Sequence, residues 1–331
     1  MSDATLPAVI ETPKSSDRFV PVAFDRGAPL ITEPGFYPDI TPAQYFAEPC
    51  PEAALSNSGV TILNEETPYD FAYQHAALNP DPAIRESSVA MRTGDLVHQL
   101  ALGKGKGYRV GQWDEWRSND AKAFRDACLE NGLVPVKPKD FDAAEIMASI
   151  VRERIDRALQ GADFHTELVF AWVEIVHVPD LNRAVHVWCR GMLDVWAHDI
   201  VTALDPKITA YLTNRRVRAH IQNMGWDNQA AFYMRGLSKL VPSAAGRIRF
   251  KDLMIKPKAP FTSRTVDISR EWVSSSQVEI ERALVTFARC MATNSWPGYA
   301  DDGETLDPPP WLLKNRLEAM EMAAAADDEE A

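Results

Sequence analysis

The sequence predicts an α/β fold with a small mixed central sheet flanked by helices. Helical periodicity dominates up to residue 160, and a stretch rich in Val, Trp and Phe follows at 167–204. One further strand pattern then lies between two helical segments. The 331 residues are 46% hydrophobic and 25% charged, which suits a globular domain with a core of useful size.

The helical part follows an N-terminal region, residues 1–40, that is rich in Pro and small polar residues. We expect this region to form an extended or partly disordered arm. Thr41 and Pro42 predict the N-cap and first turn of a short helix. The periodicity predicts further helices at about 56–63, 87–102, 119–131 and 141–160.

The strand-rich part predicts two strands at 167–178 and 184–196, joined by a turn, and a third at 200–204. The later elements are a helix over 214–240, a strand over 247–255 and a helix over 276–292.

The domain organisation follows from these elements. A single domain is expected over 41–315, between the arm at 1–40 and an acidic tail at 316–331.

Composition limits the class of protein. Cys50, Cys128, Cys189 and Cys290 form no CxxC pair, which argues against a zinc ribbon or an iron–sulfur cluster and favours buried free thiols. No stretch reaches the roughly 18 apolar residues of a membrane span, and the N-terminus lacks a secretion signal. We therefore expect a cytoplasmic protein. The net charge of −12 argues against a nucleic-acid partner, unless the basic residues are concentrated in one place.

The most informative residues are Asp194, Asp205 and Lys207. Strand side chains alternate between faces, so Asp205 and Lys207 project to the same side. If the two strands pair, Asp194 converges on Asp205, and two carboxylates suit Mg²⁺, with Mn²⁺ as a substitute. Lys207 would then contact the attacking water or the phosphate. The alternative is that all three are solvated charges at strand ends.

Gln229 and Tyr233 lie at helical i, i+4 spacing on one face. The pair can hydrogen-bond a DNA backbone or orient the lysine, and the alternative is a half-buried helix face with a polar rim. His98 alone is more typical of a core histidine than of a ligand. Glu167, at the start of a strand, is by itself more typical of a solvated charge.

Basic residues gather in three places and are candidates for DNA phosphate contacts. They are Arg215, Arg216 and Arg218 before the predicted site helix, Arg247, Arg249 and Lys251 alternating along a strand, and Lys104 and Lys106 in a Gly-rich turn. An ordinary charged rim is the alternative for each. The turn lacks the spacing of a phosphate-binding P-loop.

These residues fall within motifs that resemble the RecE-like (exodeoxyribonuclease VIII-like) branch of the PD-(D/E)XK nucleases of phages and prophages. The similarity covers about 41–311. Its motifs are, in chain order, LSNSG (55–59), MRTGDLVH (91–98), Glu167 before VFAW (169–172), RGMLD (190–194), DPK (205–207), QAAFY (229–233) and NSWPGY (294–299).

The resemblance implies a PD-(D/E)XK restriction-endonuclease-like core and a metal-dependent exonuclease that degrades linear double-stranded DNA from its ends. It also implies a single-strand annealing protein as recombination partner and a clamp-like homo-oligomer. Through the matching motifs, Asp194, Asp205, Glu167 and His98 become candidate metal ligands. Lys207, Gln229 and Tyr233 join the two aspartates as candidate catalytic residues.

Pro206 departs from the family pattern, because proline removes a strand donor. We therefore expect the strand to end or bulge between Asp205 and Lys207. Two other functions remain open: an endonuclease on the same scaffold, and a catalytically silent DNA-binding or recombination-mediator protein in which Pro206 has spoiled the site.

Overall fold

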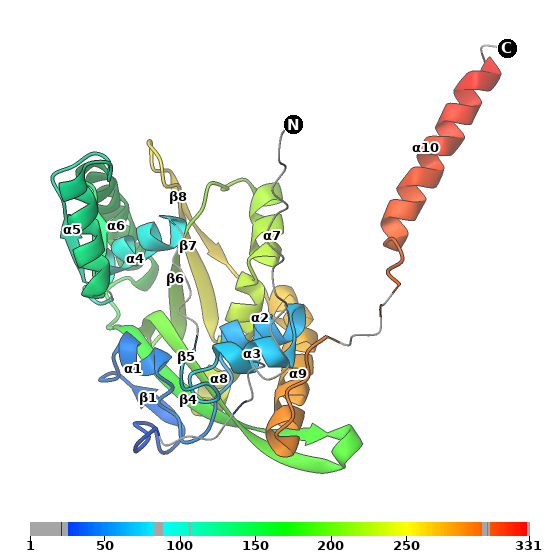
Figure 1. Cartoon of the computed structure of the whole chain (residues 1–331), viewed down its shortest axis with the longest axis horizontal. Coiled ribbons are helices and arrows are strands. Elements are labelled where there is room, and N and C mark those ends of the chain that lie inside the picture. The colour runs from blue at the N-terminus through cyan, green and yellow to red at the C-terminus, as the bar shows by residue number, and fades with distance from the viewer. Residues whose placement is uncertain are drawn as a thin grey trace, which may run out of the picture. The chain divides into compact units, whose positions relative to one another are not determined.

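The computed structural model describes residues 21, 26–82, 89–105, 107–299, 303 and 305–329 (Figure 1). The chain forms two compact units, Met1–Pro297 and Gly298–Ala331. The candidate site residues all belong to the first unit. Of the predicted N-terminal arm, residues 1–20 and 22–25 lie outside the described residues.

A six-stranded mixed sheet forms the centre of the first unit, in the order β1-β4-β5-β6-β7-β8. Its strands are β1 (Gly35–Tyr37), β4 (His165–Val178), β5 (Arg183–Ala197), β6 (Thr202–Ile208), β7 (Arg249–Ile255) and β8 (Ser263–Asp267). Neighbours are antiparallel except β6 and β7, which run parallel. The predicted small mixed sheet flanked by helices is confirmed, and β1 lies within the region predicted as an arm.

The described helices of this unit are α1 (Pro42–Phe46), α2 (Asn57–Glu65), α3 (Pro68–Gln74), α4 (Val89–Leu102), α5 (Asn119–Glu130), α6 (Pro138–Leu159), α7 (Asn214–Asn223), α8 (Trp226–Leu240) and α9 (Arg270–Thr293). Of these, α4 and α6 pack on one side of the sheet and α8 and α9 on the other. A separate pair of short parallel strands, β2 (Tyr108–Val110) and β3 (Val134–Val136), lies next to α5.

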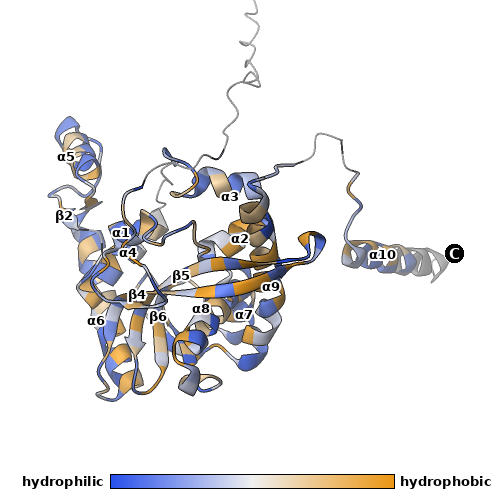
Figure 2. Ribbon diagram, turned by 90° about the horizontal axis from the view of Figure 1, so that it is seen from below, coloured by the Kyte–Doolittle hydropathy of each residue, from blue (hydrophilic) through white to orange (hydrophobic). Residues whose placement is uncertain are grey.

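Alternation along the strands explains why two layers of helices form. Leu253 and Ile255 of β7 pack into one core with α4 and α6, whereas Phe250 and Met254 pack into another with α8 and α9. Figure 2 shows the apolar residues of β4 and β5, which contact α8 and α9. Because β6 and β7 are covered on both faces, most of their side chains are expected to be apolar. Polar side chains on these strands therefore indicate a functional site.

The helix predicted over 214–240 is instead two helices. Gly225 adopts a left-handed conformation with φ of 61°, and its N–H donates to the carbonyl of Gln222. A glycine in this conformation ends a helix without steric cost, so α7 stops at Asn223 and α8 starts at Trp226. Because of this break, the direction in which the α7 arginines project is not fixed by the face of α8 that carries Gln229.

The second unit contains the helix α10 (Pro310–Glu329), which includes most of the segment predicted as an acidic tail. Residues 330 and 331 lie outside the described residues. None of the described helices is long and apolar enough to cross a membrane. The four cysteines are free and buried, as predicted.

Candidate active site

Four acidic residues form one row across four neighbouring strands. Asp205 of β6 pairs directly with Asp252 of β7. The pairing of β5 with β6 ends at Val195 and Leu204, and the next position in that register places Asp194 opposite Asp205. The flanking pairs of β4 and β5 likewise place Glu167 opposite Asp194.

The ladder between β4 and β5 is interrupted within this row. Thr166 pairs with Val195 and Leu168 pairs with Leu193, but Glu167 and Asp194 between them do not pair. Glu167 has a positive φ of 47°, which is strained for a residue with a side chain. Such strain persists where the surrounding structure enforces it, and it is concentrated at functional sites.

The carboxyl groups of Asp194 and Asp205 are close enough to act on each other directly. Burial raises the pKa of Asp194 well above its usual value, and the neighbouring Asp205 raises it further. Two carboxylates in contact disfavour double ionisation, so Asp205 favours the protonated form of Asp194.

Lys207 projects into the same site. Its Nζ lies 2.8 Å from Oδ2 of Asp205 and donates a hydrogen bond of 2.7 Å to Oε1 of Gln229. Burial lowers the pKa of Lys207, but Asp205, Asp252 and Asp194 outweigh this effect and raise it overall. The lysine is therefore held as a positive charge among carboxylates.

The expectation that Pro206 ends or bulges the strand is wrong. β6 continues to Ile208, and Pro206 pairs with Leu253 of β7 without a shift in register. The carbonyl of Pro206 accepts a hydrogen bond of 3.2 Å from Nε2 of His98, on the side where β6 no longer pairs with β5. The missing N–H of the proline points to that same side, so no ladder bond is lost.

His98 reaches the site from α4. Because the carbonyl of Pro206 only accepts, Nε2 of His98 carries the proton in that contact. Nδ1 of the same ring then faces Asp194, 3.7 Å from its Oδ2. An imidazole nitrogen at this place, in its neutral form, is a suitable additional metal ligand.

The acidic residue that the sequence did not single out is Asp252. Its side chain is 0% exposed, and neither carboxylate oxygen has a hydrogen-bond partner among the described residues. Burial raises its pKa to about 8, with Asp205 and Asp194 adding to the rise against the opposing effect of Lys207. The signal in the sequence is a lone acid between apolar residues of a buried strand, a position where an unpaired charge is costly.

Tyr233 lies in the packing layer beneath the site. Its ring contacts that of Phe170, and burial raises the pKa of its hydroxyl well above its usual value. A Cβ at Gly191 would lie 2.9 Å from the Tyr233 ring, so this position of β5 has room only for glycine. Of the predicted pair on α8, Gln229 is the residue with a described contact to Lys207.

Arg190, four residues before Asp194, has a different role. Its Nε lies 3.1 Å from Oε2 of Glu48, and its Nη1 donates a bond of 2.8 Å to the carbonyl of Tyr45. Its guanidinium also lies 4.4 Å from the centre of the Tyr45 ring. The arginine thus joins the N-terminal segment to β5 and is buried with its partner acid.

The predicted phosphate-binding residues differ in what surrounds them. Arg249 and Lys251 both contact Asp267, at 2.7 and 3.6 Å, and Arg247 donates to the carbonyl of Ser243. Lys104 donates to the carbonyl of Thr166, and Lys106 lies outside the described residues.

The arginines of α7 are exposed and form no ion pair with the acids of the described chain. They are Arg215, Arg216 and Arg218.

The donor set of the site fits a hard divalent cation. Glu167, Asp194 and Asp205 offer carboxylate oxygens, and His98 offers Nδ1. Oε2 of Glu167 is buried without a hydrogen-bond partner in the described chain. No group of three or more His, Cys, Asp or Glu among the described residues is already arranged around one point. The carboxylates would therefore have to turn to share an ion.

Comparison with known proteins identifies the class. The model of a PDDEXK-like domain of unknown function, DUF3799, matches residues 72–308, and the chain belongs to this family. The fold is accordingly that of the PD-(D/E)XK nucleases, a class that generally uses divalent metal ions.

Solved structures with a similar course of the chain include a candidate exonuclease from Eubacterium rectale. It is 14% identical, with 78% of this chain and 90% of that chain covered and a TM-score of 0.48. The protein SSO0001 is 11% identical, with 64% of this chain and 90% of that chain covered and a TM-score of 0.25. No curated protein matches this chain.

Proposed function

We propose that the protein is a Mg²⁺-dependent exodeoxyribonuclease, with Mn²⁺ as a substitute, that hydrolyses linear double-stranded DNA from its ends. One observation supports this most strongly: Asp194 and Asp205 meet on adjacent strands with the ammonium group of Lys207 beside them. An acid pair with a lysine suits phosphodiester hydrolysis, which needs a cation, a positioned water and a positive charge near the phosphate.

The two aspartates would hold the metal ion, helped by Glu167 or His98. The ion would polarise the phosphate and lower the pKa of a bound water. Lys207 stays protonated in this acidic surrounding and stabilises the negative charge that develops on the phosphate. Gln229 holds the ammonium group of Lys207 in place through its Oε1.

The proposed substrate is DNA held by arginine contacts to its phosphates. Arg215, Arg216 and Arg218 on α7 are exposed, and they carry no acid partner within the described residues. The basic residues of β7 are partly neutralised by Asp267 and contribute less. A homo-oligomer that encloses DNA, and a single-strand annealing protein as partner, belong to the same proposal.

The test compares end-labelled linear duplex with covalently closed circular duplex, each incubated with Mg²⁺ or with EDTA. We expect that only the linear duplex is lost, and that it is lost in Mg²⁺ but not in EDTA. Loss of both forms would identify an endonuclease, and loss of neither would identify a DNA-binding protein without catalysis. The Asp205→Asn variant, which keeps the shape of the side chain, controls for a contaminating nuclease.

A further inference from the structure

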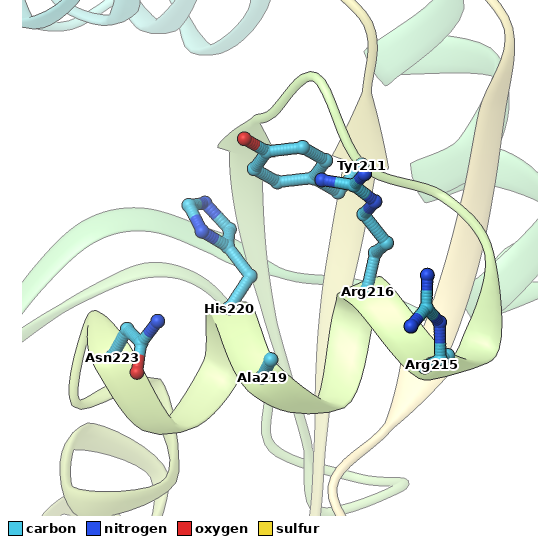
Figure 3. Close-up of a pocket in the computed structure, with 6 residues that line it drawn as sticks. All are labelled: Tyr211, Arg215, Arg216, Ala219, His220 and Asn223. Carbon is cyan, nitrogen blue, oxygen red and sulfur yellow. The ribbon is translucent and has the colours of Figure 1, made fainter. Parts of the chain in front are cut away.

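One face of α7 lines a pocket of about 400 Å³ (Figure 3). Its lining residues come from one stripe of the helix and the segment before it: Tyr211, Arg215, Arg216, Ala219, His220 and Asn223. The volume lies within the range of roughly 300–1,000 Å³ that is usual for small-molecule sites.

The two ends of the pocket differ in chemistry. Arg215 and Arg216 lie at one end, His220 and Asn223 lie at the other, and the small side chain of Ala219 leaves space between them (Figure 3). No acid of the described chain forms an ion pair with either arginine. One end therefore suits a phosphate, and the other offers an imidazole and an amide to a neutral polar group.

The aromatic rings of Tyr211 and His220 line the pocket. The Tyr211 and His220 ring centres are 5.2 Å apart at an angle of 71°, and the guanidinium of Arg216 lies 5.3 Å from the Tyr211 ring centre. Burial lowers the pKa of His220, which favours its neutral form. A neutral ring beside a tyrosine suits the face or edge of a nucleobase.

The pocket is connected to the catalytic lysine by ring contacts. The His220 and Trp226 ring centres are 4.8 Å apart, and Nζ of Lys207 lies 5.3 Å from the Trp226 ring centre. A strand whose phosphate lies at Lys207 thus has its neighbouring nucleotide within reach of the pocket.

We infer that the α7 pocket binds one unpaired nucleotide of the strand being cut, adjoining the phosphate at Lys207. The next phosphate binds between Arg215 and Arg216, and the base lies against Tyr211 and His220. A base in this position cannot stay paired in a duplex, so the enzyme engages a locally single-stranded end. This inference rests on the proposed nuclease function and adds a base-binding site to it.

The first experiment measures binding without metal and without cleavage. A deoxynucleoside 5′-monophosphate, the corresponding nucleoside and inorganic phosphate are each titrated into the full-length protein by calorimetry in EDTA. The monophosphate is expected to bind at least about tenfold more tightly than either fragment, because only it fills both ends of the pocket. Phosphate binding as tightly as the nucleotide would reduce the pocket to a simple anion site and overturn the inference.

Two matched variants test the place of binding. Arg216→Gln should weaken nucleotide binding at least about tenfold, whereas Arg183→Gln should not. Arg183, at the start of β5, is exposed and does not line the pocket, so the two variants lose the same charge. Equal losses in both would mean a diffuse electrostatic effect and would contradict the inference.

Filling the pocket gives a steric test that does not change charge. Ala219→Leu keeps a good helix former at an exposed position and should weaken nucleotide binding by about tenfold or more. Unchanged binding would place the nucleotide elsewhere. Because these experiments need no cleavage, a protein that binds nucleotides here but cuts no DNA would refute the nuclease function and leave the pocket assignment standing.

Discussion

The carboxyl groups of Asp194 and Asp205 meet one residue beyond the point where β5 and β6 stop pairing. Up to Val195 and Leu204 the strands are joined by backbone hydrogen bonds, and beyond them the strands separate. The separation exposes the two acids to each other and leaves the Pro206 carbonyl free to accept from His98. The end of a strand pair thus creates a place where acids can meet within a buried sheet.

Replacing either acid is expected to abolish cleavage. Asp194→Ala or Asp205→Ala removes one of two carboxylates that would hold the ion, and a site with too few charged oxygens binds Mg²⁺ weakly. The fold should persist, because the removal also relieves repulsion within the row. Turnover of labelled DNA and the far-UV spectrum of each purified variant check both expectations. Activity near that of the original protein in either variant would refute the assignment.

Removing the ammonium group of Lys207 is expected to lower turnover without emptying the metal site. Lys207→Met should reduce the rate by roughly 10²–10³, the usual cost of losing one positioned electrostatic contact. Binding of Mn²⁺, followed by its paramagnetic effect, should be kept or strengthened, because a positive neighbour is gone. Lys258→Met, at an exposed lysine, gives a control for the change in net charge. Weaker Mn²⁺ binding in Lys207→Met would contradict the role assigned to the lysine.

Much of this site follows from local sequence rules. Asp205 and Lys207 share a side because strand residues alternate, and Gln229 was found through helical spacing. The contact of Gln229 with Lys207 spans 22 residues, which local rules do not reach. It required knowing that α8 crosses next to the end of β6.

Asp252 was missed for a related reason. Its place beside Asp205 comes from the parallel pairing of β6 with β7, strands separated in sequence by two helices, and their register has no local signal. The error over Pro206 also came from register, because the cost of proline depends on whether a partner strand lies on its N–H side. The helix over 214–240 was extended through Gly225 because apolar periodicity continues on both sides of that glycine.

Arg190 is expected to matter for stability rather than for catalysis. Arg190→Ala leaves the Glu48 carboxylate buried without its guanidinium partner, which should cost roughly 3–5 kcal/mol of unfolding free energy. The double variant Glu48→Gln, Arg190→Met should recover part of that loss, because no buried charge is left unpaired. Urea denaturation of the three proteins gives the free energies. A loss of cleavage with unchanged unfolding free energy would instead place Arg190 in the chemistry.

The stability of the metal-free protein is expected to fall as the pH rises. The pKa of Asp252 is raised to about 8 in the folded chain, above its ordinary value of 3.8, so the folded state binds more protons than the unfolded state between these values. The stabilising effect of that proton is complete below the unfolded pKa and is lost as the pH rises through the folded pKa. Asp194, whose pKa is also raised, acts in the same direction.

Asp252→Asn isolates this effect, because asparagine has a similar shape and no charge to lose. Urea denaturation in EDTA at several pH values between about 5 and 8 gives the free energy of unfolding. This free energy should fall with rising pH by on the order of a few kcal/mol in the original protein and by less in the variant. Asp114→Asn, at an exposed acid, controls for net charge. Saturating Mg²⁺ should reduce the decline in the original protein, since an ion bound by Asp194 and Asp205 would replace the proton on Asp194. A variant whose stability falls with pH as steeply as the original would exclude Asp252 as a source of the effect.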